Sequence, residues 1–377
     1  MSGPARVSAR VSARVPVVFL LEDLDVGGTQ TQTLELAARL DPARFVPTLV
    51  TLRAGSGAFA ERAASRGLDW LPLTRHPGPI RFSRALPALW RYLAAEKPPL
   101  VQLLTVLPNI WGRVFGRLVG LPGIIGCCRG VSAVRGQHEG LLGGIPAAHI
   151  GNARSICDAL ARLPRVAAER VFFIPNGVDT DYFVPAPEET REPIVLCVAR
   201  WVPVKNHRLL LEAFARVRGV MPGAKLHLVG EGECEGELRR LAASGPPESV
   251  VFLPAGTDVR PHYQGAQVFV LSSDHEGTPN AVLEAMACGL PVAATRAGGV
   301  AEAVAHGESG FLCDTGDAGA LANGMLRLLT EPDTRRAFGR AGRARAEERY
   351  GMAPMVRAHE AVYDMVLARQ GLLRARA

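Results

Sequence analysis

The sequence predicts an α/β protein of two domains, each built on a doubly wound parallel sheet. Short apolar runs alternate with segments of helical periodicity along most of the chain, which is typical of parallel strands covered by helices. At 377 residues the chain is long enough for two domains. The segment 185–193, rich in proline and glutamate, separates two runs of this alternation and has the composition of a linker.

The composition suits a folded cytoplasmic protein with large hydrophobic cores. Apolar residues make up 48% of the chain and charged residues 21%, which argues against extended disorder. The seven cysteines form no CxxC pair, so we expect reduced thiols rather than disulfides. No apolar run approaches the ~18 residues of a membrane span. We therefore expect the protein in the cytoplasm.

Positive charge is concentrated in the first half of the chain. Residues 1–190 hold 21 Lys and Arg against 15 Asp and Glu, whereas residues 191–377 hold 22 against 21. A basic half suits an anionic acceptor or a membrane surface. The Arg-rich repeat 5–14 fits either a disordered tail or a contact with anionic lipid, which would make the protein peripheral at the inner face of the cytoplasmic membrane. Nucleic acid is not expected as a partner, because no nucleic-acid-binding module is recognisable.

In the first domain, apolar runs predict buried strands and apolar residues at helical spacing predict helices. The expected strands are 15–21, 45–52, 68–73, 100–105, 123–128, 148–152 and 171–174. The expected helices are 29–40, 57–66, 82–97, 109–119 and 153–163, and the glycine-rich segment 136–147 is expected to be a loop. Gly27 and Gly28 lie in a strand–turn–helix opening, where they fit a plain tight turn as well as a loop that faces a ligand.

The alternation starts again after the linker. The expected strands are 194–199, 225–229, 250–253, 268–271, 291–295 and 310–313. The expected helices are 207–218, 235–243, 259–264, 280–287, 300–305, 318–329, 334–349 and 353–372. Both halves are therefore predicted to be Rossmann-like.

The stretch 273–291 carries the strongest functional signal. Gly277 and Pro279 mark a tight loop between a buried strand and the helix expected over 280–287. The amide groups at the N-terminus of this helix form a favourable site for an anion. The loop and the start of the helix are therefore expected to bind phosphate.

Two carboxylates flank this anion site. Glu276 precedes the loop and Glu284 lies inside the helix, roughly 10 Å away by helical rise. As isolated residues both would face solvent in most proteins. Here the neighbours of Glu284 are apolar, and a carboxylate in such surroundings requires a partner. Together the two carboxylates suit hydroxyl groups at both ends of a sugar nucleotide whose phosphates rest on the amides.

Arg200 and Lys205 follow directly on the strand expected over 194–199. Because ligands of parallel sheets bind at the carboxyl ends of the strands, both cations are well placed for a ligand. A guanidinium fork and a lysine point charge suit a diphosphate, which they bind more tightly as negative charge builds on the leaving group. The alternative, two solvated surface cations, is weakened by the carboxylates downstream.

Glu276 and Glu284 also form a motif that resembles the Glu-x7-Glu signature of retaining glycosyltransferases of GT-B fold, in the large family called GT4. The resemblance runs through 193–349 with the expected order of parts, and more loosely through 15–184. It implies two Rossmann-like domains that face an interdomain cleft. The implied parts are a basic tail 1–14, an N-terminal acceptor-binding domain 15–184, a linker 185–193, a C-terminal nucleotide-sugar-binding domain 194–349, and a C-terminal helix 350–377 that crosses back to the first domain.

The resemblance implies roles for the residues at matching positions. Glu276 would meet the hydroxyls of the donor sugar, while Arg200 and Lys205 would hold the phosphates, so these three are the expected catalytic residues. Glu284 would accept hydrogen bonds from the ribose. The other expected donor-binding residues are Gly27, Gly28, Gly230, Glu231, Gly277, Thr278, Pro279, Asn280 and Ala281. Arg129 and Asn109 are expected on the acceptor side, and the base is expected near Thr257 and Asp258.

No metal is expected at the site. Asp23-Leu-Asp25 has the DxD pattern of metal-dependent GT-A transferases, but it abuts the first strand and no further GT-A pattern follows. Many relatives carry a histidine where this chain has Arg129, which cannot act as a base. The resemblance implies that a phosphate of the donor takes the acceptor proton. His138 or His149 would assist or be structural.

The resulting interpretation is a retaining, metal-independent hexosyltransferase with no cofactor besides its co-substrate. It would move a sugar from a nucleotide diphosphate sugar, with UDP-sugar favoured over GDP-sugar, to a lipid-linked or polysaccharide acceptor. The alternatives are a non-catalytic sugar-nucleotide-binding partner in polysaccharide assembly and a GT-B epimerase or phosphorylase. An NAD-dependent enzyme fits poorly, because the chain has no clean GxGxxG motif followed by an acidic residue on the next strand.

Overall fold

The computed structural model describes residues 14–75, 78–130, 137–187, 192–243, 245–246, 248–254, 256 and 258–372. The basic repeat before residue 14, residues 188–191 of the linker and Thr257 lie outside this part of the chain. The described residues fall into two compact units. The first contains the chain up to Gly126, Ile145–Ala147 and the residues from Val362 on, and the second contains Cys127–Gly144 and Ala148–Ala361.

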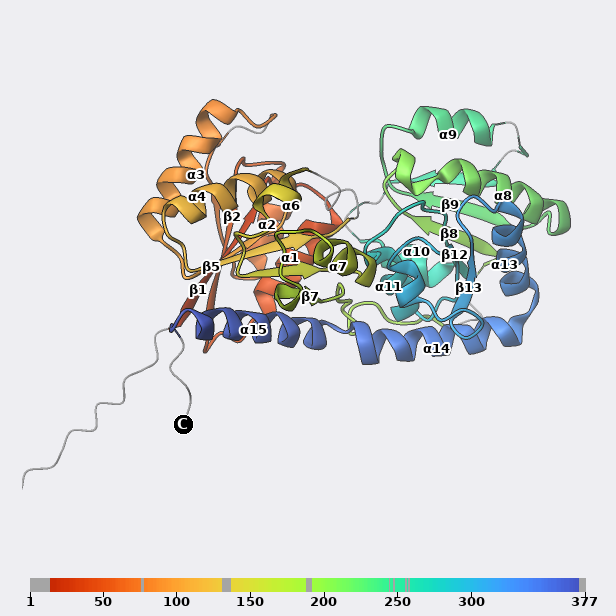
Figure 1. Ribbon diagram of the computed structural model, residues 1–377. Helices are drawn as coiled ribbons and strands as arrows, with labels where there is room; N and C mark the ends of the chain where they lie inside the picture. The colour runs from red at the N-terminus through yellow and green to blue at the C-terminus, as the bar shows by residue number, and fades with distance from the viewer. Residues whose placement is uncertain are drawn as a thin grey trace, which may run out of the picture. The chain divides into compact units, whose positions relative to one another are not determined.

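Two parallel sheets form the framework, as the alternation of apolar runs predicts (Figure 1). The first sheet has seven strands in the order β3-β2-β1-β4-β5-β6-β7. Its strands are β1 (Val15–Leu21), β2 (Phe45–Thr51), β3 (Asp69–Pro72), β4 (Leu100–Leu103), β5 (Gly123–Cys128), β6 (Ala148–Gly151) and β7 (Val171–Phe173). β1, β4, β5 and β6 are almost wholly buried, as strands covered on both faces should be.

The helices between these strands are α1 (Gly28–Arg39), α2 (Gly57–Ser65), α3 (Phe82–Glu96), η1 (Pro108–Gly112), α4 (Arg113–Leu118), α6 (Gln137–Leu142) and α7 (Arg154–Ala161). They follow the apolar periodicity of the sequence, with three differences. α1 begins one residue before the predicted Thr29, with Gly27 as its N-cap. The helix expected from 109 begins with the π-helical turn η1. The prediction of a loop over 136–147 was wrong for its first half, because Gln137–Leu142 form α6 despite Gly140.

The second sheet has six strands in the order β10-β9-β8-β11-β12-β13. These are β8 (Ile194–Val198), β9 (Lys225–Val229), β10 (Val250–Leu253), β11 (Val268–Leu271), β12 (Val292–Thr295) and β13 (Gly310–Cys313). β8 therefore lies between β9 and β11, its neighbours on either side. This is the point at which the strand order reverses, where open parallel sheets bind their ligands.

The helices of this part of the chain agree with the sequence within about three residues at either end. They are α8 (His207–Val220), α9 (Glu235–Ala242), α10 (Arg260–Gly265), α11 (Asn280–Ala287), α12 (Val300–Ala303), α13 (Ala318–Thr330), α14 (Pro332–Tyr350) and α15 (Met352–Arg369). Within the described residues, no helix is both long and apolar enough to cross a membrane.

α11 is the most deeply buried of the short helices. Val282, Leu283, Ala285, Met286 and Ala287 are each fully buried and belong to one hydrophobic core cluster. The helix ends at Ala287 and is followed by Gly289, which has a φ of 68°, the left-handed conformation that glycine adopts without strain. This burial fixes α11 within the core of the second unit.

Candidate functional site

Three loops with predicted site residues follow three neighbouring strands. Arg200 comes two residues after β8, Gly230 directly after β9, and Ser272 directly after β11. Because the strands are parallel and adjacent, their carboxyl ends lie at one edge of the sheet. The fold therefore brings the predicted phosphate ligands and the Glu276 loop to the same edge.

Lys205 and Glu276 meet at this edge. The Lys205 Nζ donates to Glu276 Oε1, and the hydroxyl of Ser273 donates to the same oxygen at 2.6 Å. The two charged side chains are only 18% and 11% exposed. The main chain is joined as well, since Ser272 Oγ donates to the Lys205 carbonyl at 2.9 Å. Because both charges are largely shielded from water, each depends on the other and on Ser273 for stabilisation.

Arg200, in contrast, has an exposed side chain with no hydrogen bond or ion pair to the described residues. Its neighbour Trp201 donates its main-chain N–H to the Glu231 carbonyl at 2.8 Å. A Cβ at Gly230 would lie 2.1 Å from the Ala199 carbonyl oxygen, and one at Gly232 would lie 2.3 Å from that of Trp201. Glycine at 230 and 232 therefore permits the backbone to lie close to the 199–201 segment, and the side chain of Glu231 is exposed.

The loop from Gly277 to Pro279 is buried and fits tightly against a second loop. A Cβ at Gly298 would lie 2.2 Å from the Glu276 carbonyl oxygen, and one at Gly299 would lie 2.4 Å from that of Gly277. No larger residue fits at 298 or 299 without moving the backbone. Asn280 opens α11 and Pro279 is its N-cap, so the helix N-terminus lies where the sequence predicts it.

Glu284 has the partner that its apolar surroundings require. Its Oε2 accepts a hydrogen bond at 2.8 Å from the hydroxyl of Tyr263, which is fully buried. Burial, reinforced by the charge of Glu284, raises the pKa of Tyr263 well above its usual value, so the tyrosine stays a donor. The contact of Glu284 with a ribose stays a prediction.

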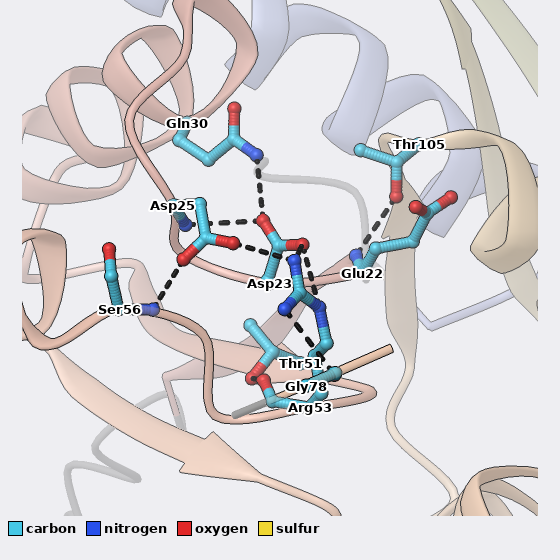
Figure 2. Close-up of polar contacts among 9 residues, drawn as sticks. All are labelled: Glu22, Asp23, Asp25, Gln30, Thr51, Arg53, Ser56, Gly78 and Thr105. Carbon is cyan, nitrogen blue, oxygen red and sulfur yellow. Dashed lines mark hydrogen bonds and ion pairs between the residues drawn. The ribbon is translucent and has the colours of Figure 1, made fainter. Parts of the chain in front are cut away.

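The Asp23-Leu-Asp25 motif is occupied by an arginine (Figure 2). Arg53 Nη2 donates to Asp23 Oδ2 at 2.5 Å and to Asp25 Oδ2 at 2.6 Å. Asp23 also accepts from Gln30 at 3.3 Å, and Asp25 accepts from the amide of Ser56. These bonds fix the loop that leads to Gly27 and Gly28. In the described part of the chain, no cluster of His, Cys, Asp and Glu is arranged to hold a metal ion.

The two residues expected on the acceptor side lie in different surroundings. Asn109 is buried; its Nδ2 donates to the carbonyls of Leu103 and Thr105, and its Oδ1 accepts from Arg113 at 2.9 Å. Arg129 donates to Asn176 Oδ1 at 3.2 Å. These contacts anchor both side chains inside the fold, and their role toward an acceptor stays a prediction.

Asp258, expected near the base, pairs with its neighbour Arg260. The hydrogen bond from Arg260 is the main reason why the pKa of Asp258 falls to about 2. The guanidinium of Arg260 also stacks 3.9 Å from the centre of the Tyr182 ring, and Tyr182 donates to Asp258 at 3.2 Å. His149 is buried and bonded through Nε2 to the Gly143 carbonyl at 2.8 Å, which supports the structural alternative for this residue.

Four residues at the site were missed from the sequence. Ser273 and Tyr263 hold the two glutamates, while Asn152 and Asn176 contact the Gly277–Asn280 loop. Ser273 lies within the stretch 273–291, so its polarity beside a predicted ligand loop was a usable signal, and Asn176 follows the strand expected over 171–174. Tyr263 and Asn152 lie in segments with no distinguishing pattern, and only tertiary structure brings them to the site.

Two sequence families match the chain in succession. The model described as "Glycosyltransferase Family 4" matches residues 26–182, and the model described as "Glycosyl transferases group 1" matches residues 179–345. Together they extend over most of both sheets.

Curated relatives match over part of the chain. A GDP-mannose-dependent alpha-(1-6)-phosphatidylinositol monomannoside mannosyltransferase of Mycolicibacterium smegmatis is 34% identical over 222 residues, which are 52% of this chain and 58% of that protein. The lipopolysaccharide core biosynthesis glycosyltransferase LpsE of Rhizobium meliloti is 35% identical over 151 residues, which are 40% of this chain and 43% of that protein. The chain thus spans about half the length of the curated relatives it matches.

Solved structures match over nearly the whole chain. HepE of Anabaena, crystallised with UDP-glucose, has a TM-score of 0.82 at 19% identity and covers 93% of this chain and 100% of its own. The sucrose-phosphate synthase of Thermosynechococcus elongatus has a TM-score of 0.77 at 22% identity, and the match covers 94% of this chain and 100% of that protein. At these identities the likeness establishes the fold.

Proposed function

Because the chain belongs to the family 4 (group 1) glycosyltransferases of GT-B fold, we propose that it transfers a hexose from a nucleotide diphosphate sugar to a lipid-linked or glycan acceptor with retention of configuration. The single observation that carries this proposal is the meeting of Lys205 with Glu276 beside the exposed Arg200, at the point where the strand order of the second sheet reverses. Such a point is where parallel sheets bind nucleotides.

The proposed chemistry is stabilisation of the leaving group. Arg200 and Lys205 would hold the diphosphate and bind it more tightly as charge builds on the bridging oxygen. The amides at the start of α11 would bind the same phosphates. Glu276 would orient the donor sugar through its hydroxyls and Glu284 would hold the ribose. The acceptor proton would pass to a donor phosphate, so the reaction would need neither a metal nor a general base at position 129.

The domains would divide this work. We propose that the part of the chain over 15–184 selects the acceptor and that the part over 194–349 binds the donor, with α15 returning to the first. Closure around the donor would exclude water and so prevent hydrolysis. Relatives described as GDP-mannose-dependent and a fold neighbour crystallised with UDP-glucose leave both bases as candidates for this chain.

A lipid-linked acceptor would bring the protein to a membrane surface. α3 and α4 are in contact through Trp90 and Phe115, whose rings lie 5.5 Å apart. Phe82, Trp90 and Leu118 are 50%, 40% and 68% exposed on these helices. The exposed basic residues beside them are Arg81, Arg84, Arg91 and Arg117, and the only acidic residue on either helix is Glu96. Exposed aromatic and aliphatic groups among arginines suit the interface of an anionic membrane.

The experiment that tests the proposed function is a thermal-shift panel of UDP, GDP and their sugars, with and without EDTA. A ligand that binds only the folded chain raises its unfolding temperature in proportion to ln(1 + [L]/Kd). We expect one base to give a shift that persists in EDTA. Release of the free diphosphate only when acceptor is added would then separate transfer from epimerisation, phosphorolysis and passive binding. No shift with any nucleotide would contradict the proposal.

A further inference from the structure

Asn176 forms the hub of a polar network in the turn after β7. Its Nδ2 donates to the Thr278 carbonyl at 2.8 Å and to Asn280 Oδ1 at 2.7 Å. Its Oδ1 accepts from Arg129 Nη1 at 3.2 Å and from Asn152 Nδ2 at 3.3 Å. The side chain is 7% exposed, and both amide hydrogens and both lone pairs are used.

Asn152 holds the same loop from its other side. Its carbonyl accepts a hydrogen bond from the hydroxyl of Thr278. A Cβ on Gly277 would lie 2.5 Å from Asn152 Oδ1 and 2.8 Å from the Arg129 carbonyl. The loop thus lies directly on this polar network, and glycine at 277 is what permits the close approach.

The chemistry of the bonded atoms matters for an anion. Thr278 O and Asn280 Oδ1 are electronegative oxygens at the start of α11, the same helix end whose amides are proposed to bind phosphate. An oxygen left without a donor there would repel an anion and would compete for the free amides. By donating to both oxygens, Asn176 engages them, which leaves the amides and the positive end of the helix dipole to the phosphate.

We propose that Asn176 is a positioning residue that prepares the N-terminus of α11 for the donor diphosphate and aligns it with Arg129. This inference rests on the proposed function and adds to it a residue that acts through Thr278 and Asn280 rather than by touching the reacting atoms.

Two substitutions separate the bonds that Asn176 donates to the loop from the bonds that it accepts from Arg129 and Asn152. Asn176→Asp keeps the shape and an oxygen that accepts from Arg129 and Asn152, but it loses the two donors to the loop and adds a negative charge. Asn176→Ala loses all four bonds. If the donors to the loop are what matters, both variants lose diphosphate affinity. Because the added charge of Asn176→Asp would by itself weaken anion binding, the neutral Asn176→Ala must show the same loss for the donors to be responsible.

The measurement is calorimetric titration of the full chain with UDP and GDP, together with KM and kcat for the donor sugar and a thermal unfolding curve. For Asn176→Asp we expect at least a tenfold rise in the Kd of the preferred diphosphate and in the donor KM, with a smaller change in the acceptor KM. Tyr363→Phe serves as the matched control, because it removes the buried hydroxyl that donates to Gln102 in the first unit. We expect its diphosphate Kd to equal that of the natural chain.

The outcomes distinguish the two proposals. Unchanged diphosphate affinity in a folded Asn176→Asp protein, with the natural chain binding well, would overturn the role of Asn176 alone. Failure of the natural chain to bind either diphosphate would overturn the proposed function and this inference together. If Asn176→Ala does not fold, Asn176→Leu, which keeps the volume of the side chain without adding charge, replaces it.

Discussion

Lys205 and Glu276, 71 positions apart in the chain, form an ion pair in which one carboxylate oxygen accepts from both the lysine ammonium and Ser273. The two residues are expected to bind different parts of a donor, phosphate and sugar. Each therefore neutralises the other before a ligand arrives. A diphosphate that approaches Lys205 must compete with Glu276, whereas a sugar hydroxyl can donate to Glu276 without displacing the lysine.

Replacing Glu276 should separate binding from transfer. In Glu276→Ala the sugar loses its orienting carboxylate, so we expect transfer to fall at least 100-fold. Lys205 is released from its partner, so UDP or GDP should bind as well as before or better. Calorimetry and an assay of diphosphate release measure the two effects, with the unfolding curve as a check on the fold. Full transfer by a folded variant would contradict the assignment.

Replacing Lys205 should weaken diphosphate binding. Lys205→Ala removes a cation from the phosphate site, and we expect the Kd of the preferred diphosphate to rise about tenfold or more. Arg208→Ala is the control, because this arginine is 70% exposed and pairs only with Glu237 among the described residues. An equal Kd for Lys205→Ala and Arg208→Ala would remove the proposed role of Lys205.

Tyr263 should stabilise the fold through Glu284. Tyr263→Phe removes a buried hydroxyl that donates to a half-buried carboxylate, so we expect unfolding free energy to fall by about 1–3 kcal/mol. Tyr182→Phe removes a hydroxyl from an exposed side chain bonded to Asp258 and should cost under about 0.5 kcal/mol. Urea unfolding of both variants provides the comparison. An equal loss of unfolding free energy in the two variants would contradict the proposed stabilisation of Glu284 by the Tyr263 hydroxyl.

Two buried histidines should make the fold sensitive to acid. Burial is the main cause that lowers the pKa of His207 and of His359 from 6.5 to about 4. Both are neutral in the folded chain, so their contribution is complete above about pH 6.5 and is lost as the pH falls toward 4. The loss approaches about 3 kcal/mol for each histidine. His359→Gln should flatten this decline in unfolding free energy, and urea unfolding of the natural chain and the variant between pH 7 and pH 4 measures it.

The surface of α3 and α4 should bind anionic vesicles. We expect sedimentation with vesicles rich in phosphatidylglycerol and little with neutral phosphatidylcholine. Arg84→Glu combined with Arg91→Glu should reduce binding at least tenfold, and Trp90→Ala should reduce it further. Arg208→Glu reverses the charge of an exposed arginine in the second unit and should have no such effect. Equal sedimentation of all variants would contradict the proposal that this surface binds membranes.

Much of the fold was predictable because its local and tertiary requirements agree. β1, β5 and α11 have the predicted bounds, since an unbroken apolar run between glycine or polar residues has few alternatives. α6 was missed because Gly136 and Gly140 suggest a loop, while tertiary contacts, including the burial of Glu139, permit a helix.

The sequence predicted the placement of candidate site residues only where they directly follow a strand. Lys205 and Glu276 each come after an expected parallel strand, so both could be assigned to the carboxyl ends of strands. Other bonds join segments that are far apart in the chain, and hydrophobic periodicity cannot predict them. Examples are the bonds of Arg53 to Asp23 and Asp25 and the bond of Asn176 to Thr278. Why glycine stands at 298 and 299 also becomes clear only from the neighbouring carbonyls.

The burial of α11 has a further consequence. The helix whose N-terminus is proposed to hold the donor is also the centre of a hydrophobic core, and α14 packs against it so closely that a Cβ at Gly339 would lie 2.3 Å from the Gly289 carbonyl. Ligand recognition and structural integrity therefore share one element. A substitution on α14 can alter affinity for a nucleotide that it never contacts, and bound donor should protect the amides of α11 and α14 together from hydrogen exchange.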